Sequence, residues 1–296
     1  MVAKRVLVLL STYNGEKYIG EQIDSIIVQE NVDVSILIRD DGSNDNTVQL
    51  LANYESNKIR LIKGENVGAT QSFIKLIEEC EGCEYYAFAD QDDVWDSDKL
   101  FVAIQELEKH RDIPALYSSN TRLVDFKLNV ISKENKNPKI DLGSALVKNY
   151  VTGCTTVFND LLMKQLKKYS PSNVAYHDWW ANLITLSVGG ISIYDDTPHI
   201  SYRQHEHNVV GAPNGALARW KTRFKKYKSN CYYRNQMADQ ILKYYSNDLT
   251  NESREILDVM ASYRSKKVKI ILDARFKTRK ILDNILFAIC VITDKI

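Results

Sequence analysis

Short apolar segments alternate with amphipathic segments along the first hundred residues of the chain. Four of the apolar segments are continuous, as expected for strands that are buried on both faces of a parallel sheet. They lie at residues 5–11, 34–38, 59–62 and 85–89. Apolar residues at helical spacing follow each of them, at about residues 16–29, 47–54, 70–79 and after Asp96, which is expected to cap the last helix. The pattern predicts a doubly wound α/β domain.

The pattern is more mixed between residues 111 and 215 and changes again after Gly215. In the mixed part, a helix is predicted at residues 177–188 and strands at 116–124, 155–158, 191–194 and 199–202. Pro and Gly are absent from the rest of the sequence, and long helices are predicted at about residues 216–245, 252–265 and 276–292. We therefore expect an α/β domain over residues 1–215 and a helical C-terminal region over residues 216–296.

The charge of the chain is divided between these two parts. The 296 residues are 44% apolar and 26% charged, which excludes a disordered chain, and their net charge is +1. Residues 1–215 hold 21 Lys and Arg against 30 Asp and Glu, whereas residues 216–296 hold 18 against 8. This balance, without a recognisable nucleic-acid-binding motif, disfavours a nucleic-acid partner. An acidic body with a basic extension predicts contact with an anionic surface.

The apolar blocks near the two ends are short. The block at residues 6–10 is followed by no small-residue cleavage site, so it is not typical of a signal peptide. The apolar run at residues 285–292 is far below the ~20 residues that cross a bilayer. We expect a cytoplasmic protein that can bind peripherally to the inner face of the cell membrane.

Polar loops follow the first two predicted strands, at the edge where ligands bind in sheets of this kind. Residues 11–15 (Ser-Thr-Tyr-Asn-Gly) offer hydroxyls, an amide and an aromatic ring. Residues 40–43 (Asp-Asp-Gly-Ser) offer carboxylates that can accept hydrogen bonds from a nucleoside. Each loop alone is also typical of a turn. The sequence lacks GxGxxG and GxxxxGK[ST] motifs, which disfavours a dinucleotide site and a P-loop.

The fourth predicted strand is followed by three carboxylates within four residues, Asp90, Asp92 and Asp93. Their mutual repulsion at the edge of a sheet raises their pKa values unless a cation compensates. Mg²⁺ and Mn²⁺ prefer such oxygen ligands and complete their coordination with phosphate oxygens and water. The alternative is a solvated acidic turn, but a nearby Asp-Asp-Gly-Ser loop favours the metal site.

Two further groups of polar residues lie in the second half of the chain. Asp178 lies between His177 and two tryptophans, where partial desolvation would suit a general base. The same segment is also typical of a helix N-terminus whose tryptophans enter the core. Arg203 and His205 alternate on a predicted strand, so both can face one side, where His205 would ligate a metal or contact a diphosphate.

Taken together, these motifs resemble glycosyltransferase family 2, whose members have the GT-A fold. The resemblance covers about residues 5–212 and rests on segments 11–14, 40–43, 66–68, 90–93 and 177–178, in the order and at the spacing of the family. The forms Asp-Gln-Asp-Asp-Val-Trp, His-Asp-Trp-Trp and Tyr-Arg-Gln-His are similar to those of bacterial rhamnosyltransferases of cell-wall, capsular or O-antigen polysaccharide synthesis. The resemblance implies a Rossmann-like, doubly wound mixed sheet with a C-terminal helical extension.

The resemblance assigns a donor site to the strand ends. It implies that Ser11, Thr12 and Tyr13 surround the nucleobase of a nucleoside-diphosphate sugar. Asp41 would accept a hydrogen bond from that base, and Asp90 would bind the ribose. Arg203 is expected to contribute to the same donor site.

The resemblance also assigns the chemistry. Asp92 would ligate Mn²⁺ or Mg²⁺ bridging the donor diphosphate, with His205 as a second ligand. Asp178 occupies the position of the catalytic base, where the family commonly has Glu-Asp and this chain has His-Asp. The QxxRW motif of processive synthases is absent from the sequence, which disfavours a chain-extending enzyme.

The implied reaction is a metal-dependent, inverting transfer of a sugar onto a hydroxyl of a glycan or lipid-linked glycan. L-Rhamnose from dTDP-rhamnose is the expected donor. A UDP-hexose or UDP-N-acetylhexosamine donor and a catalytically inactive sugar-nucleotide-binding paralogue are the alternatives. A nucleotidyltransferase is disfavoured because the first loop is not a glycine-rich phosphate loop.

The basic C-terminal region combines cations with apolar residues. Six Lys and Arg and three aromatic residues lie between residues 219 and 228. A later helical stripe of Ile and Leu lies at residues 281, 282, 285, 286 and 289, beside three further cations. Packing against the α/β body, attachment to an anionic membrane and a homodimer interface are the three interpretations of these features.

Overall fold

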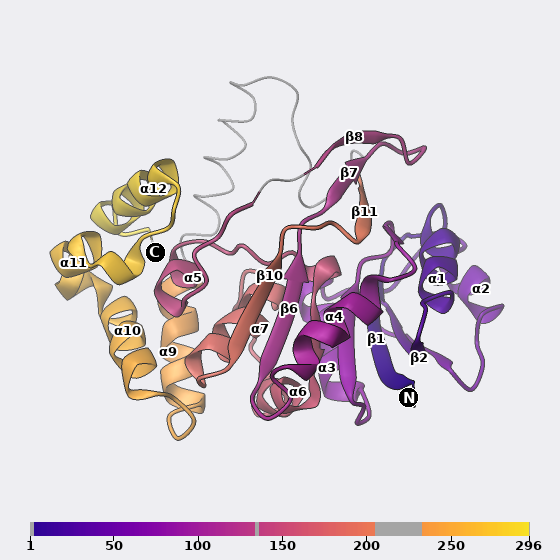
Figure 1. Cartoon of the computed structure of the whole chain (residues 1–296), viewed down its shortest axis with the longest axis horizontal. Coiled ribbons are helices and arrows are strands. Elements are labelled where there is room, and N and C mark those ends of the chain that lie inside the picture. The colour runs from indigo at the N-terminus through magenta and orange to yellow at the C-terminus, as the bar shows by residue number, and fades with distance from the viewer. Residues whose placement is uncertain (1–2, 134–135, 205–232, 296) are drawn as a thin grey trace.

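The computed structural model describes residues 3–133, 136–204 and 233–295 (Figure 1). Its centre is a seven-stranded sheet with the strand order β10-β6-β9-β4-β1-β2-β3. Neighbours are parallel except for β9, which is antiparallel to both β4 and β6. The strands are β1 (Lys4–Thr12), β2 (Val32–Asp40), β3 (Ile59–Lys63), β4 (Tyr85–Ala89), β6 (Ala115–Ser119), β9 (Val157–Asn159) and β10 (Ile191–Asp195). The expected mixed, doubly wound sheet is confirmed.

Helices cover both faces of this sheet, because successive residues of each strand point to opposite sides. On one face, Val8 and Ala87 pack with α1 (Ile19–Ile27), α2 (Thr47–Ala52) and α4 (Lys99–Glu108). On the other face, Leu9 and Phe88 pack with α3 (Ala69–Glu79), α5 (Leu142–Val147), α6 (Asp160–Leu166) and α7 (His177–Ser187). The continuous apolar strands of the sequence are therefore strands with two buried faces.

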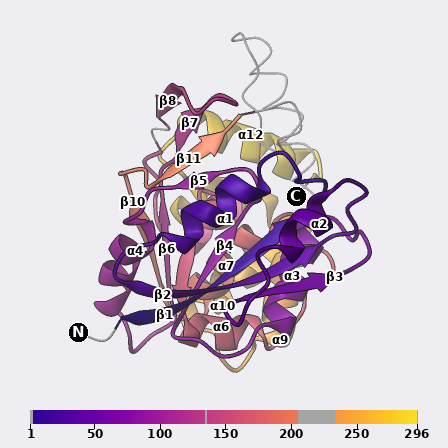
Figure 2. The same ribbon diagram turned by 90° about the vertical axis from the view of Figure 1, so that its right-hand side faces the viewer.

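A smaller four-stranded sheet, with the order β5-β11-β7-β8, lies beyond the main sheet on the side away from the start of β1 (Figures 1 and 2). Its strands are β5 (Val94–Trp95), β7 (Arg122–Val124), β8 (Val130–Lys133) and β11 (Ile200–Arg203). The single strand predicted at residues 116–124 is therefore wrong, since β6 and β7 belong to different sheets. Asn120 ends β6 by donating its backbone N–H to Asp195 and its amide to the Asp196 carbonyl.

The expected cap of α4 by Asp96 is also wrong. The helix begins at Lys99 after Asp98, whose side chain makes no capping hydrogen bond. The carboxylate of Asp96 instead accepts two hydrogen bonds from the guanidinium of Arg122, at 3.0 and 2.9 Å. This bidentate geometry is a strong form of ion pair, and it joins the start of α4 to the smaller sheet.

Four helices in the described part of the C-terminal region, residues 233–295, lie beyond β10 (Figure 1). They are α9 (Arg234–Tyr244), α10 (Asn251–Ala261), α11 (Tyr263–Leu272) and α12 (Ile281–Ile292), with the short 3-10 helix η3 (Ala274–Phe276) before α12. Their buried residues, including Met237, Leu257 and Phe287, share one hydrophobic core with Trp180 of α7. Arg234 is buried and donates to the carbonyls of Leu146 and Val147 at 3.0 and 2.9 Å. Packing on the body thus explains the inner faces of α9–α12.

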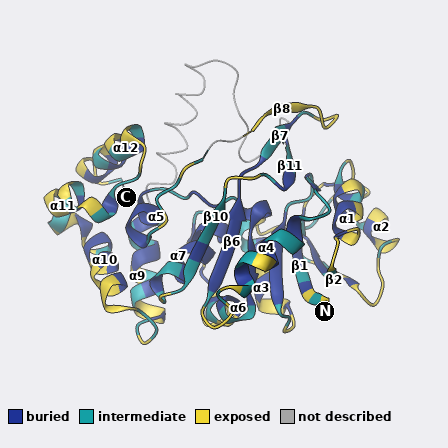
Figure 3. Ribbon diagram, in the orientation of Figure 1, coloured by how far each residue is buried: buried dark blue, intermediate teal, exposed yellow. Residues whose placement is uncertain are grey.

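The outer faces of the last two helices are exposed (Figure 3), and several of the exposed residues are apolar. Ile281 and Ile285 of α12 are 77% and 51% exposed, and Leu272 of α11 is 75% exposed. Among the helices that the structure describes, none combines the length and apolarity needed to cross a membrane. The cation-rich segment 219–228 and the boundary expected at residues 211–215 lie outside the described residues.

Candidate active site

The loops that follow β1, β2 and β4 meet at one edge of the main sheet. The strand register places Thr12 opposite Asp40 and Leu10 opposite Ala89, so the segments after these residues are neighbours. The polar motifs at residues 11–15, 40–43 and 90–93 therefore lie together at the carboxyl ends of parallel strands. This is the edge at which such sheets bind ligands.

Gln91 joins two of these loops. Its amide oxygen accepts from the Thr12 hydroxyl at 2.6 Å and from the Tyr13 backbone N–H at 2.8 Å, and its amide nitrogen donates to the Tyr13 carbonyl at 3.2 Å. A Cβ atom at Gly15 would lie 2.6 Å from that amide oxygen, so the glycine permits the close approach. The ring of Tyr13 stays 43% exposed above the loop. Gln91 thus fixes the segment that was expected to surround a nucleobase.

Asp41 is buried in a network of hydrogen bonds. Its carboxylate accepts from the Arg39 guanidinium and from the backbone N–H groups of Val67 and Gly68, at 3.0 and 2.9 Å for the latter two. The hydroxyl of Ser11 donates to Ser72, a neighbour of the same arginine. A carboxylate has about four acceptor positions, so three protein donors leave one for a ligand. The contact of Asp41 with a nucleobase remains a prediction.

The loop after β4, residues 90–93, is called the acidic loop, and the pKa values of two of its carboxyl groups are raised. Burial and the like charges of Asp92 and Asp178 raise the pKa of Asp90 to about 7. Burial and the charges of Asp92 and Asp90 raise the pKa of Asp93 well above its ordinary value. Because the charge of Asp178 acts on Asp90, the structure brings these two distant residues into one region.

Cys154 lies against this loop from η1 (Gly153–Thr155), which precedes β9. Ligand atoms of Asp90, Asp93 and Cys154 all lie within 4.8 Å of one another. Burial and the two carboxylates raise the pKa of the Cys154 thiol, so it stays protonated and can donate its single S–H to either carboxylate. The sequence did not indicate a role for Cys154, and it indicated Asp93 only as one of the three carboxylates of the acidic motif.

The acidic loop fits a divalent cation. Burial, together with the repulsion between its carboxylates, raises the pKa values of Asp90 and Asp93. Carboxylate oxygens are also the ligands that Mg²⁺ and Mn²⁺ prefer. Lys99, a buried cation near the cluster, carries only part of its usual positive charge at neutral pH. Burial lowers the pKa of Lys99 to about 7, and this side chain is 1% exposed. The roles of Asp92 and of His205, which lies outside the described residues, remain predictions.

Asp178 lies in the first turn of α7, where the helix dipole favours negative charge. Burial raises the pKa of its carboxyl to about 6. The Trp179 N–H and the Asn149 amide donate to the same oxygen at 2.6 and 3.1 Å and oppose that shift. The side chain is 8% exposed. A carboxylate that is ionised at neutral pH but more basic than usual suits a general base.

His177, beside Asp178, is part of the apolar core. Its ring stacks on Phe73 with centroids 3.7 Å apart and meets the edge of Phe88. Burial lowers the pKa of His177 to about 3, so the ring is neutral. A Cβ atom at Gly153 would lie 2.8 Å from its Nε2, which explains why glycine is found there. The His-Asp pair therefore places no second charge beside the candidate base.

Arg203, the last residue of β11, contacts the acidic loop through hydrogen bonds. Its Nε donates to the Asp92 carbonyl at 2.9 Å, its Nη1 donates to the Phe126 carbonyl at 2.7 Å, and its Nη2 pairs with Glu21. Its backbone N–H donates to Asp93 at 3.2 Å. Because the residue is only 2% exposed, these contacts position the loop. Direct contact of Arg203 with a donor remains a prediction.

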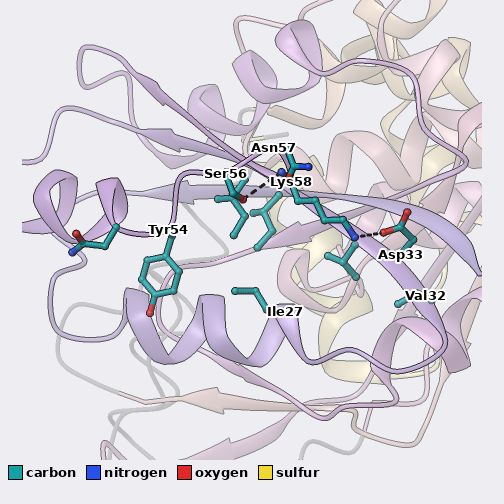
Figure 4. A pocket seen from close by; sticks show the side chains of 11 residues that line it. Ile27, Val32, Asp33, Tyr54, Ser56, Asn57 and Lys58 are labelled. Atoms are coloured by element: carbon teal, nitrogen blue, oxygen red, sulfur yellow. Dashed lines mark hydrogen bonds and ion pairs between the residues drawn. The ribbon is translucent and has the colours of Figure 1, made fainter.

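A separate cavity of about 420 Å³ lies at the other edge of the sheet, between α1 and the starts of β2 and β3 (Figure 4). Its polar contacts include the ion pair of Lys58 with Asp33, at 2.6 Å. Tyr54 and Ile27 form part of its wall. None of the motifs at residues 11–15, 40–43 or 90–93 contributes to it, so the candidate active site lies at the carboxyl edge.

Two curated relatives resemble the chain over most of its length. The dTDP-rhamnosyl transferase RfbG of Shigella flexneri is 32% identical over 227 residues, which are 72% of this chain and 77% of the relative. The UDP-Glc:alpha-D-GlcNAc-diphosphoundecaprenol beta-1,3-glucosyltransferase WfgD of Escherichia coli is 28% identical over 188 residues, 63% of this chain and 72% of the relative.

Two solved structures share the fold at low sequence identity. S. aureus TarS 1-349 in complex with UDP-GlcNAc has a TM-score of 0.61 and 18% identity, over 97% of this chain and 79% of that chain. The mannosyltransferase PcManGT from Pyrobaculum calidifontis, in complex with GDP-Man and Mn²⁺, has a TM-score of 0.57 and 18% identity, over 98% and 74%. Residues 7–165, more than half of the sequence, match the family described as Glycosyl transferase family 2, and the chain therefore belongs to this family of GT-A glycosyltransferases.

Proposed function

We propose that this glycosyltransferase moves L-rhamnose from dTDP-rhamnose onto a hydroxyl of a lipid-linked glycan. The donor is supported by the relative RfbG, whose name describes a dTDP-rhamnosyl transferase. The lipid-linked acceptor is supported by the relative WfgD, whose name describes a diphosphoundecaprenol-linked acceptor. The observation that supports this chemistry best is the position of Asp178 close to the acidic loop. Burial is the largest cause of the raised pKa of Asp90, and the charge of Asp178 raises it further.

The proposed reaction is a single displacement. The acceptor hydroxyl attacks the anomeric carbon of the donor, and Asp178 accepts the hydroxyl proton as the new C–O bond forms. The bond from the anomeric carbon to the phosphate oxygen breaks, and its electron pair leaves with the nucleoside diphosphate. Attack opposite the leaving group inverts the anomeric configuration. Asn149 and the Trp179 N–H orient the Asp178 carboxylate for this step.

We propose Asp92, together with its neighbours in the acidic loop, as ligands of Mn²⁺ or Mg²⁺. When bound, such an ion stabilises the negative charge that the departing diphosphate develops. Gln91 and Arg203 hold the loop in place through Tyr13 and the Asp92 carbonyl, so the carboxylates keep their positions. The donor base is proposed to lie against Tyr13, with Ser11, Thr12 and Asp41 beneath it and the ribose at Asp90.

A UDP-sugar donor is the second candidate. The WfgD relative uses UDP-Glc by name, and the TarS structure contains UDP-GlcNAc. A donor screen separates the candidates: purified protein is incubated with dTDP-rhamnose, UDP-glucose, UDP-galactose or UDP-N-acetylglucosamine, with and without Mn²⁺ or Mg²⁺, and released nucleoside diphosphate is measured. We expect release from dTDP-rhamnose that depends on the metal. Release of nucleoside diphosphate from a UDP-sugar but not from dTDP-rhamnose would exclude the rhamnosyl assignment. No release from any of the four donors would favour the inactive paralogue.

We also propose that α11 and α12 bring the enzyme to an anionic membrane surface. The exposed Ile281, Ile285 and Leu272 accompany the exposed cations Arg279 and Lys280, a combination typical of interfacial helices. The test is sedimentation with phosphatidylglycerol vesicles of the intact chain and of an Ile281→Ser/Ile285→Ser variant. A truncation is unsuitable because α9–α12 share the core of the body. Equal sedimentation of both proteins would exclude this surface, and loss of a dimer in the variant would assign it to self-association.

A further inference from the structure

A small cleft of about 80 Å³ lies between the loop that flanks α5 and the start of α12. Five cationic side chains line it: Lys136, Lys139, Lys148, Arg279 and Lys280. Among the described residues of its wall, Asp283 is the acidic one. Cations from two segments about 140 residues apart in the sequence therefore converge on one point.

We propose that this cleft binds the phosphate or diphosphate group of the acceptor, which makes the acceptor a glycan attached to a lipid through that group. The inference rests on the glycosyl transfer proposed above and specifies its second substrate. The donor diphosphate is assigned elsewhere, to the acidic loop.

Two of the five cations have carboxylate partners. Lys148 pairs with Asp283 at 2.7 Å, and Lys139 pairs with Asp141 at 2.9 Å. Within the part of the chain that the structure describes, Arg279 and Lys280 make no ion pair, so their positive charges can be balanced by a bound anion. Like charges gathered in a cleft repel one another, and an anion between them removes that repulsion. The N-terminus of α12, which is the positive end of its helix dipole, begins next to Lys280 in the cleft wall and also favours a bound anion.

The cleft is next to the candidate base. Asn149 is in its wall and also donates its amide to Asp178 at 3.1 Å. Lys136 is in the wall too, and its Nζ donates to Thr152, one residue before the glycine that contacts His177. One side chain thus touches both the cleft and the group that is to receive the acceptor proton. An acceptor anchored here by its phosphate presents the sugar next to that phosphate to the base.

The surroundings of the cleft suit a lipid. Arg279 and Lys280 form its outer rim, and the next turns of α12 expose Ile281 and Ile285. A phosphate in the cleft would therefore leave its lipid chain beside an apolar surface, while its sugar points toward Asp178. A soluble, neutral glycan acceptor would use neither the cations nor the isoleucines.

The test uses an Arg279→Ala/Lys280→Ala variant, since both side chains are exposed and neither belongs to the core. The matched control is Lys109→Ala/Arg111→Ala, which removes the same two residue types from exposed positions at the opposite edge of the sheet. An Arg279→Lys/Lys280→Arg variant keeps the charges. Binding of inorganic diphosphate and of geranyl diphosphate is measured by calorimetry in metal-free buffer, which does not require enzyme activity.

We expect the alanine pair to weaken binding of both probes by about tenfold or more, as for the loss of charge-assisted hydrogen bonds. The control and the charge-preserving variant should bind as the unaltered protein does. In transfer assays, the KM for a glycan on a lipid diphosphate should rise, while the donor KM and transfer to a neutral acceptor, the octyl glycoside of the same glycan, stay unchanged. Equal diphosphate binding by all proteins would overturn the proposal.

Other outcomes separate the competing sources of the anion. A rise in the donor KM alone would assign the cleft to the donor and overturn the proposal. Loss of sedimentation with phosphatidylglycerol vesicles, with unchanged diphosphate binding, would assign the cations to phospholipid headgroups and also overturn it. If the unaltered protein transfers no sugar but binds diphosphate through Arg279 and Lys280, the proposed function fails and the anion site stands.

Discussion

Asn149 offers a direct test of Asp178 as the base, because its amide stabilises the charged carboxylate of Asp178 without taking part in the proton transfer itself. Its amide donates to Asp178 at 3.1 Å in a partly buried setting. A hydrogen bond to a charged group contributes about 1.5–3 kcal/mol, and each 1.36 kcal/mol corresponds to about one pKa unit. Removing the amide in Asn149→Ala should therefore raise the pKa of Asp178 from about 6 to roughly 7–8.

The sign of the effect on activity follows from the role of a base. Transfer requires ionised Asp178, so kcat/KM of the unaltered enzyme should fall as the pH drops through about 6. In Asn149→Ala the same fall should begin one to two units higher, so that activity at pH 6.5 drops about tenfold and recovers by pH 9. The acidic side of the pH profile of kcat/KM should therefore move to higher pH, while the maximal kcat/KM at high pH stays the same.

The assay is kcat/KM for sugar transfer from pH 5 to 9.5, followed through released nucleoside diphosphate. Asn129→Ala is the control, since Asn129 makes the same kind of amide hydrogen bond at 3.0 Å to Asp125, an exposed residue on the loop between β7 and β8. Its profile should match that of the unaltered enzyme. An acid limb that stays in place in Asn149→Ala, or a uniform loss at every pH, would refute the role given to Asp178.

Three further substitutions test the same site. Asp178→Asn should lower kcat by about 10²–10⁴ with donor binding preserved. Burial raises the pKa of Asp178 from 3.8 to about 6, so its charged form destabilises the fold above pH 6. The Asp178→Asn variant should therefore gain up to about 3 kcal/mol of unfolding free energy at pH 7. A Tm below that of the unaltered protein would contradict this. Asp92→Ala should weaken donor binding in calorimetry with Mn²⁺ but not without it, and an unchanged metal dependence removes Asp92 as a ligand. Gly153→Ala should cost about 1–3 kcal/mol in urea unfolding, since its Cβ would lie 2.8 Å from His177; unchanged stability would show that the ring can move.

The sequence predicts the central strands well because their physics is local. Val8 and Leu9 are both fully buried, one in each core, so an uninterrupted apolar run was the correct signal for β1. The short elements lack such a signal. All four residues of β8 are exposed, and α5 and α6 have six and seven residues, too few to display a helical period. The break at Asn120 depends on hydrogen bonds to a strand 75 residues away and could not be read locally.

The residues of the candidate site also fall into two groups, those that the sequence indicates and those that it does not. Carboxylates at strand ends are visible in the sequence, so Asp90, Asp92 and Asp178 could be named. Their supporting residues are not, because an amide such as Asn149 acts only through a partner that is distant in the chain. Gln91 was within reach, since it lies inside the Asp-Gln-Asp-Asp motif, but its bonds to Thr12 and Tyr13 depend on the sheet register.

The antiparallel strand β9 has a consequence for how the enzyme is assembled. Because β9 is the neighbour of both β4 and β6, the strand β6 has no partner in the main sheet until residues 157–159, or β10 after them, have left the ribosome. The same late segment delivers Cys154 to the acidic loop. The first half of the sheet, residues 4–89, can pair beforehand by local crossovers. The nascent chain should therefore form the loops at residues 11–15, 40–43 and 90–93 first, and Cys154 and the proposed base Asp178 should join them only once β9 and the helix α7 after it have been synthesised.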